Sequence, residues 1–250
     1  MIKPNSYLYS TLSKLKNGLW RPHLMQTELI LQRYFDCKKS GNLVQIGSND
    51  GVANDPLRPH LTVGNWKGIL VEPVPHVFAE LKKNYQGFDE NINFECSIIS
   101  TKDGTEHFYS IKKEALEKYP EYVDQLGSVS RDMVAKLKNE FPDVDHDIEE
   151  LSLPSVTFDT LVKKHGFDRV DLIHTDTEGN DDKIIATIDF EKYNPDILLF
   201  EHVHLDIESY KQLIKNLKKS KYKVFYYDLD TIAVSENILN QYPEIGKMNF

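Results

Sequence analysis

From residue 43 onward, short apolar runs alternate with longer stretches whose apolar residues recur at helical spacing. Short buried strands separated by helices are typical of βαβ units, which build a mostly parallel sheet with helices on both faces. The apolar runs predict seven strands, at 43–47, 68–72, 93–99, 170–175, 196–201, 222–228 and 231–235. The pattern therefore predicts an α/β fold around one main sheet.

Helices are predicted between these strands, and a hairpin at the end of the chain. The clearest helices are 75–85, 157–165, 180–188 and 206–219. In the last of them Tyr210, Leu213 and Leu217 share one face. Only Leu229 and Asp230 separate the final two strands, so we expect them to pair antiparallel at an edge of the sheet.

Two segments depart from this rhythm. Leucines at helical spacing over 8–19, and an apolar stripe over 24–35, predict a helical cap at 1–40 on a main domain at 41–250. The stretch 105–155 contains one short apolar strand and then polar, acidic helical material. It is interpreted as an insertion near the site, which either closes over a ligand or is a solvated excursion without a role.

The composition narrows the class of protein. Apolar residues make up 40% of the chain, the apolar runs are short, and the N-terminus lacks the apolar region of a secretory signal, so we expect a cytoplasmic protein without a membrane span. Cys37 and Cys96 are too few for a disulfide scaffold. A net charge of −9 argues against nucleic acid as a partner. Aromatics such as Tyr7 and Trp20 suit either the cap or a homodimer interface.

Polar residues gather at the ends of five predicted strands. They lie at 47–51, Glu72, 97–100, 174–179 and 201–204. Ligands of open parallel sheets bind beyond the carboxyl ends of the strands. Five polar strand ends therefore predict a binding site along this edge.

The first of these loops reads Gly-Ser-Asn-Asp-Gly. Gly47 and Gly51 bracket a tight turn whose free amides can hold a carboxylate or phosphate. The run is not G-x-G-x-x-G, and Asp50 would repel a pyrophosphate. A ligand that combines an ammonium, a carboxylate and a sulfonium suits this loop better.

Glu72 ends the second strand, 25 residues after Gly47. This is close to the spacing of roughly 20 residues at which an acid accepts hydrogen bonds from ribose hydroxyls. Pro73 and Pro75 end the strand and begin the next helix, so Glu72 is expected at the rim of the site.

The fourth and fifth strand ends carry acids and histidines. His174 and Asp176 are two residues apart and lie on one side of an extended strand, and Glu178 follows them. The fifth strand ends in Glu201, His202 and His204. Such groups can supply a general base for a hydroxyl or amine, ligands for a divalent cation, or a hydrogen-bonded network with neither role.

Taken in order, these motifs resemble the FkbM family of S-adenosylmethionine-dependent methyltransferases over about residues 43–205. The segments are VQIGSNDG (44–51), NDPLRP (54–59), WKGILVEPVPHVF (66–78), FECSIISTKDG (94–104), VTFDTLVKKHGFDRVDLIHTDTEGND (156–181) and DILLFEH (196–202). The family's own motifs are (I/V)GANDG, EP and K-I-D-V-E-G. This chain differs at Ser48, where alanine is usual, and at His174, where lysine is usual, and a histidine differs from a lysine in charge near neutral pH.

The resemblance implies a Rossmann-like fold with strand order 3-2-1-4-5-7-6, the hairpin supplying the last two strands. It also implies S-adenosylmethionine as cofactor. The implied cofactor-binding residues are Gly47, Ser48, Asn49, Asp50 and Gly51 at the methionine end, Glu72 and Pro73 at the ribose, Ser97 and Ile98 at the adenine, and Asp176. The family's better-known members imply a hydroxyl acceptor on a sugar, glycan or related small metabolite.

In-line methyl transfer requires an aligned acceptor and a base. We expect Asp176 or His202 as the base, with His174 next. If Mg²⁺ or Mn²⁺ takes part, Asp176, Glu201 and His202 are the expected ligands. Two other functions stay open: a nicotinamide-dependent oxidoreductase, disfavoured by the missing G-x-G-x-x-G and by Asp50, and a non-catalytic binding module on the same fold.

Overall fold

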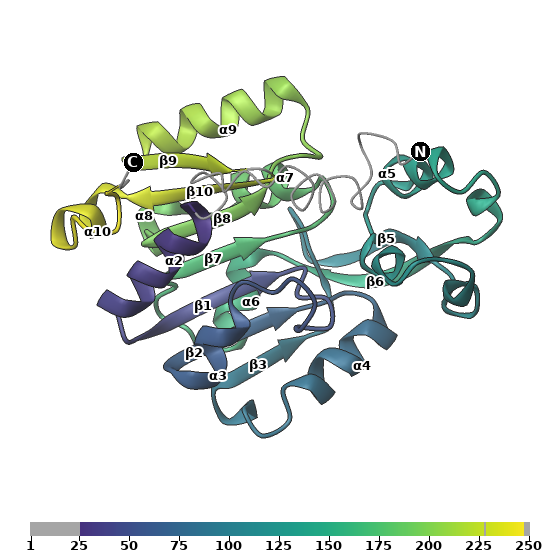
Figure 1. The fold of residues 1–250 in the computed structure, drawn as a ribbon, viewed down its shortest axis with the longest axis horizontal. Coiled ribbons are helices and arrows are strands. Elements are labelled where there is room, and N and C mark those ends of the chain that lie inside the picture. The colour runs from purple at the N-terminus through teal and green to yellow at the C-terminus, as the bar shows by residue number, and fades with distance from the viewer. Residues whose placement is uncertain (1–25, 228, 248–250) are drawn as a thin grey trace, which may run out of the picture.

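A seven-stranded sheet forms the centre of the computed structural model, which describes residues 26–227 and 229–247 (Figure 1). Its strands, in spatial order, are β3 (Ile92–Glu95), β2 (Asn65–Val71), β1 (Ser40–Ile46), β7 (Leu172–Thr175), β8 (Ile197–Glu201), β10 (Asp230–Ser235) and β9 (Tyr222–Tyr227). Numbered along the chain within this sheet, the order is 3-2-1-4-5-7-6. The predicted fold class is confirmed.

The central strands are apolar because helices cover both of their faces. Every residue of β7 and β8 is buried, and β1, β2, β3, β7 and β8 pair in parallel. β10 runs antiparallel between β8 and β9, which makes β9 an edge strand. The predicted hairpin is therefore confirmed.

One apolar core lies on each face of the main sheet, between the sheet and the helices that cover it. The helices of the main domain are α2 (Gln26–Cys37), α3 (Arg58–Val63), α4 (Pro75–Asn84), α6 (Phe158–Lys164), α7 (Asp181–Ala186), α8 (Phe190–Tyr193), α9 (Ile207–Lys219) and α10 (Glu236–Gln241). One face of the sheet packs against Ile30 of α2, Leu61 of α3 and Ile238 of α10. The other packs against Leu161 of α6 and Leu213 of α9. Within the described residues, no helix has the length and apolar character needed to cross a bilayer.

Helix α2 is the described part of the predicted N-terminal cap. Its residues Leu31, Tyr34 and Phe35 are buried in the same core as β1 and β2. The other predicted helix of the cap, over 8–19, lies outside the described residues, as do Tyr7 and Trp20. The domain boundary at residue 40 stays a prediction.

The insertion folds around a second, three-stranded sheet beside the carboxyl ends of the main strands (Figure 1). Its strands, in spatial order, are β4 (Ile98–Ile99), β6 (Ile148–Val156) and β5 (Gly104–Ile111). Its helical segments are α5 (Arg131–Ala135) and the 3₁₀ helices Lys113–Lys118, Glu121–Gln125, Lys136–Asn139 and Val144–His146, and a further 3₁₀ helix, Asp89–Asn91, precedes β3. Ile111, Val123, Val134 and Val144 give the insertion an apolar core of its own.

The structure differs from the predicted elements at two places. The strand expected at 93–99 is divided at Cys96 and Ser97 into β3 and β4, which belong to different sheets. Residues 148–156 form β6, where helical material was expected. The acidic start of β6 is half-exposed, and its pairing with β5 supplies the hydrogen bonds that local sequence does not reveal.

Candidate active site

The loop after β1 turns sharply at the carboxyl end of the sheet. Gly47, Asn49 and Gly51 have φ angles of 80°, 47° and 68°, in the left-handed region that favours glycine and asparagine. The backbone N–H groups of Gly47 and Ser48 donate to the carbonyl oxygen of Val71, at 3.0 and 2.9 Å. The loop is therefore fixed against the end of β2.

Glu72, directly after β2, closes this loop. The residue is 6% exposed, and its Oε2 and Oε1 accept the backbone N–H groups of Asn49 and Val74 at 3.1 and 2.9 Å. Burial raises the pKa of Glu72 to about 7, although both hydrogen bonds favour the charged form. Each carboxylate oxygen has a second lone pair, so a ligand hydroxyl can still donate to it.

Three residues that the sequence analysis did not single out hold the loop in place. Arg58 donates from Nη1 to the carbonyl of Gly51 at 3.0 Å and from Nη2 to that of Asn84 at 2.7 Å. Asn84 in turn donates to the carbonyl of Asp50 at 3.0 Å, and Oδ1 of Asp55 accepts the backbone N–H groups of Leu57 and Arg58 at 2.8 and 3.2 Å, where α3 begins. An aspartate just before a proline is typical of a helix start, and this signal could have identified Asp55.

Four further predicted cofactor residues lie around this loop. The Oδ1 atom of Asp50 accepts the N–H groups of the second and third residues after it, both at 2.9 Å. Pro73 is partly buried, and Ile98 is packed beside Val74. Ser97 is 1% exposed, and its Oγ has no hydrogen-bond partner among the described residues. This buried hydroxyl is left for a ligand to satisfy.

Asp176 follows β7 on the other side of the loop. Its backbone N–H donates to the carbonyl of Ile46 at 2.9 Å, which joins the two strand ends. The residue is exposed to solvent. Desolvation by the surrounding protein and repulsion from Glu178, Asp181 and Asp230 raise the pKa of its carboxyl. A carboxylate at an exposed position can reach the hydroxyl of an acceptor and accept its proton.

His174 lies inside the sheet, two residues before Asp176. The residue is 5% exposed, and its Nδ1 has no hydrogen-bond partner among the described residues. Burial lowers the pKa of His174 to about 4, so the imidazole is neutral at physiological pH. This burial removes the solvent access that a base in contact with the acceptor needs.

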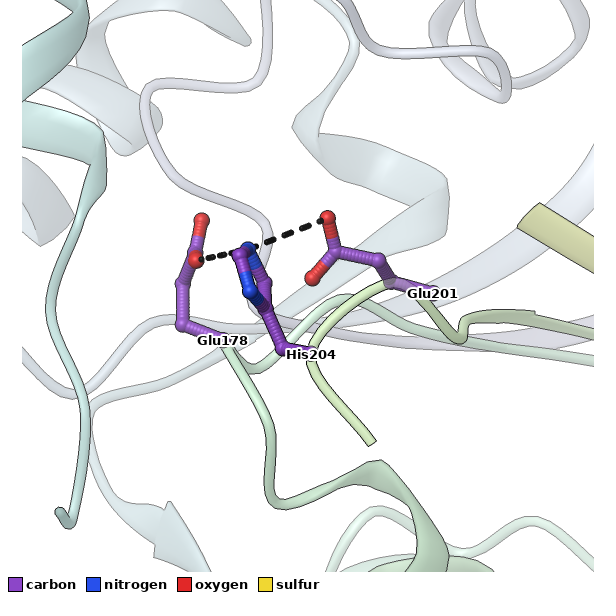
Figure 2. Close-up of side chains that lie close together, drawn as sticks. All are labelled: Glu178, Glu201 and His204. Carbon is purple, nitrogen blue, oxygen red and sulfur yellow. Dashed lines mark ion pairs between the residues drawn. The ribbon is translucent and has the colours of Figure 1, made fainter. Parts of the chain in front are cut away.

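Beyond β8, His204 lies between two carboxylates (Figure 2). Its Nε2 is 3.0 Å from Oε2 of Glu178 and 3.8 Å from Oε1 of Glu201. Glu178 has a left-handed φ of 53° in the loop after β7. Burial raises the pKa of Glu201, and repulsion from Asp176 and Glu178 adds to this shift. Acids from two neighbouring strands thus meet one histidine.

His202 contacts the neighbouring strand β10. Its Nδ1 is 3.1 Å from the hydroxyl of Thr231, which is 2.9 Å from the hydroxyl of Tyr210. The rings of His202 and Tyr210 stack with centroids 5.0 Å apart. These contacts fix the imidazole on the far side of β8 from the Glu72 loop.

The insertion touches the site through Ser128. Its Oγ donates to the carbonyl of Glu178 at 3.0 Å and accepts the N–H of Ser130 at 3.2 Å. On α4, His76 Nε2 lies 3.2 Å from Oδ1 of Asp124 in the insertion. Two contacts therefore connect the insertion to the loop after β7 and to α4.

The structure brings together a different set of possible metal ligands from the predicted set. Asp176, Glu201 and His202 were expected as ligands. Within the described ranges, the one set of possible ligand atoms within 4.8 Å of one another is Glu178, Glu201 and His204. The two sets share Glu201, and both belong to the polar strand ends that the sequence analysis identified.

A 3-2-1-4-5-7-6 sheet with its polar residues at the carboxyl ends defines the chain as a protein of the Rossmann-like α/β class. A family model, the methyltransferase FkbM domain, matches residues 45–224. The chain belongs to this family, and the resemblance inferred from its motifs is confirmed. No curated protein gives a significant match.

Several solved structures are similar to the chain. A methyltransferase FkbM from Methylobacillus flagellatus shares 13% identity at a TM-score of 0.48, covering 90% of this chain and 58% of that one. An O-methyltransferase from Bacillus cereus shares 8% identity at 0.46, covering 92% and 88%. Fibrillarin from Aeropyrum pernix, solved with S-adenosyl-L-methionine, shares 12% at 0.41, covering 90% and 74%.

Proposed function

We propose that this methyltransferase uses S-adenosylmethionine to methylate a hydroxyl of a sugar, glycan or related small metabolite. The observation that carries the proposal is the buried Glu72 carboxylate, held against the glycine loop by its bond to the N–H of Asn49. The loop itself is too tightly packed for side chains at its first position, because a Cβ at Gly47 would overlap the backbone of Asp176. The absence of a side chain therefore lets the loop lie directly against the end of β7, beside Asp176.

The residues present fit this cofactor. Gly47, Ser48, Asn49, Asp50 and Gly51 would hold its methionine end, Glu72 and Pro73 its ribose, and Ser97 and Ile98 its adenine. The unpartnered buried hydroxyl of Ser97 supports this assignment, because it lacks the hydrogen bond that a buried polar group normally makes. The bound cofactor supplies a methyl group on a sulfonium, which is a good leaving group.

The protein's own share of the reaction is alignment and proton transfer. Asp176, also at the cofactor's edge in this proposal, is the residue we assign as base, because its carboxylate is accessible. It would accept the proton of the acceptor hydroxyl as the oxygen attacks the methyl carbon. His202 is the second candidate, whereas the burial of His174 makes it a poor one.

The proposal extends to the acceptor and to the assembly of the protein. The insertion, with Ser128, Ser130 and Arg131, is assigned to acceptor binding because Ser128 bonds the loop that contains Glu178. A small-molecule or glycan acceptor, rather than nucleic acid, suits the net charge of −9. A homodimer and a cytoplasmic location stay predictions from the sequence.

Isothermal titration of the purified protein with S-adenosylmethionine tests the proposal, with NAD as a parallel titrant and EDTA in the buffer. We expect micromolar binding of S-adenosylmethionine and no heat with NAD. Binding of NAD alone would support the oxidoreductase. Binding of S-adenosylmethionine with no turnover on any hydroxylated acceptor would support the non-catalytic module.

A further inference from the structure

Glu178, Glu201 and His204 form a compact triad at the carboxyl ends of β7 and β8. Figure 2 shows the two carboxylates on opposite sides of the His204 ring, with oxygens of both acids turned toward it. Glu178 comes from the loop after β7, and Glu201 and His204 from the end of β8 and the loop that follows. The three side chains thus come from two neighbouring strand ends.

The spacing of the triad approaches that of ligands around one metal ion. Two ligand atoms that each lie about 2.1 Å from an ion are about 3.0–3.4 Å apart at octahedral or tetrahedral angles. The Nε2 atom of His204 lies 3.0 Å from Oε2 of Glu178 and 3.8 Å from Oε1 of Glu201. All three ligand atoms lie within 4.8 Å of one another, and side-chain rotations that draw them closer would place them around a shared ion.

A second observation points into the triad. Glu201 is 9% exposed, and its Oε2 is buried without a hydrogen-bond partner among the described residues. A buried carboxylate oxygen without a partner is rare, because its desolvation is not compensated. Among the described ion pairs of Glu178 and Glu201, His204 is the sole partner. A cation bound between the three side chains would give the second oxygen of Glu201 the partner that it lacks.

We propose that Glu178, Glu201 and His204 bind one divalent cation of the Mn²⁺ class. Carboxylates suit Mn²⁺, and imidazole favours a transition metal over Mg²⁺ or Ca²⁺. Three protein ligands leave coordination positions open, as in catalytic metal sites. The role of this metal ion rests on the proposed methyl transfer. Its open coordination positions would take two neighbouring oxygens of the acceptor beside Asp176, and so select diols or hydroxy-carbonyl compounds.

Electron paramagnetic resonance tests the site without cofactor or acceptor. Mn²⁺ is titrated into the metal-free protein, and the loss of the free-ion signal gives stoichiometry and affinity. We expect one Mn²⁺ per chain, and at least about a tenfold weaker affinity in Glu201→Gln and in His204→Gln. The matched control is Glu208→Gln on α9, whose carboxylate is exposed and pairs with Lys211 alone among the described ion pairs. It should bind Mn²⁺ like the unaltered protein.

Two results would overturn the site: no stoichiometric Mn²⁺ binding, or binding that the triad variants weaken no more than the control does. Circular dichroism of each variant shows whether it is folded. If Glu201→Gln does not fold, His204→Gln still tests the site, because His204 is partly exposed and its substitution disturbs the core less. S-adenosylmethionine titrations of the same samples separate the two proposals. Triad variants that lose Mn²⁺ binding but keep S-adenosylmethionine binding would support the metal site without bearing on the proposed function. Absence of S-adenosylmethionine binding by the unaltered protein would overturn the proposed function, whatever the Mn²⁺ result.

Discussion

The backbone of Gly47 packs directly against the carbonyl group of Asp176, so that a methyl group at Gly47 would overlap the Asp176 oxygen. This contact joins the loop proposed to hold the cofactor to the proposed base. Gly47 also has a left-handed φ of 80°. We predict that Gly47→Ala abolishes S-adenosylmethionine binding in calorimetry and lowers the free energy of unfolding by more than about 3 kcal/mol, because backbone must move to relieve the overlap.

The control for Gly47 is Gly87→Ala. Gly87 has a similar φ of 89°, but no atom lies within 4 Å of an added Cβ. Only the cost of the left-handed conformation remains there, about 1 kcal/mol, and cofactor affinity should be unchanged. Equal effects of the two substitutions would mean that conformational strain, not the contact with Asp176, explains the need for Gly47.

The raised pKa of Glu72 predicts a pH dependence of cofactor binding. Glu72 is protonated in the folded protein up to about pH 7, whereas the ordinary pKa of a glutamate is 4.5, so its contribution to stability is full below pH 4.5 and is lost as the pH rises to 7. A ribose diol donates best to the ionised carboxylate. The affinity for S-adenosylmethionine should therefore rise about tenfold from pH 6 to pH 8, measured by calorimetry.

Glu72→Gln should remove this pH dependence and weaken binding at pH 8. Glu80→Gln, which changes an exposed acid on the neighbouring helix α4, should keep it. A pH profile that survives in Glu72→Gln would assign the titration to another group and remove Glu72 from the ribose site.

Much of this architecture follows from local sequence, and the reasons are physical. Strands buried on both faces are rich in apolar residues, as Ile197–Glu201 is up to its final glutamate, so their runs stand out. β6 was missed because it is half-exposed and starts with acids, so its pairing with β5 decides its conformation. The polar strand ends were predictable because parallel strands end at a common edge.

The finer geometry of the site could not be predicted in this way. The sequence places His202 and His204 one and three residues after Glu201, yet His202 contacts Thr231 on β10 and His204 lies beside Glu178. The course of the loop after β8 decides between them, and that course depends on tertiary packing. The clamp of Arg58 on the glycine loop is likewise a contact between segments that local patterns do not connect.

Asp176→Asn should abolish turnover and leave S-adenosylmethionine binding within about twofold. The amide keeps the shape of the side chain but cannot accept the acceptor's proton. Single-turnover assays with a hydroxylated acceptor measure the first quantity and calorimetry the second. Asp168→Asn, at an exposed loop position before β7, is the control and should behave like the unaltered protein. Full activity of Asp176→Asn would move the base to another residue, with His202 next in order.

An ion-pair network around the buried Asp196, at the amino ends of the strands, should contribute to stability without affecting the site. The carboxylate of Asp196 accepts from Lys38 at 2.6 Å, from Arg169 at 3.1 Å and from the hydroxyl of Tyr34 at 2.9 Å, and its side chain is 3% exposed. Asp196→Ala should lower the free energy of unfolding in urea by about 2–4 kcal/mol, because it removes the buried acceptor that these donors share and leaves Asp171 as their remaining partner among the described residues.

Asp36→Ala is the control for this network. Its ion pair with Lys39 is exposed on both sides, so its loss should cost less than about 0.5 kcal/mol. Cofactor affinity should be unchanged in both variants. Similar stabilities of the two would show that the buried network adds no more than a surface pair.

Ser128 predicts how tightly the insertion is coupled to the site. Its hydroxyl bonds the carbonyl of Glu178, so Ser128→Ala should lower the free energy of unfolding by about 1 kcal/mol and speed hydrogen exchange at 126–134 and 177–180. Turnover should fall more than cofactor affinity, since the loop with Glu178 borders the acceptor in our proposal. Ser110→Ala is the matched control, because Ser110 is buried in the same insertion and its hydroxyl has no hydrogen-bond partner among the described residues. Exchange that rises equally in both variants would mean that the insertion loosens on any loss of volume, and that the bond from Ser128 does not couple it to the active site.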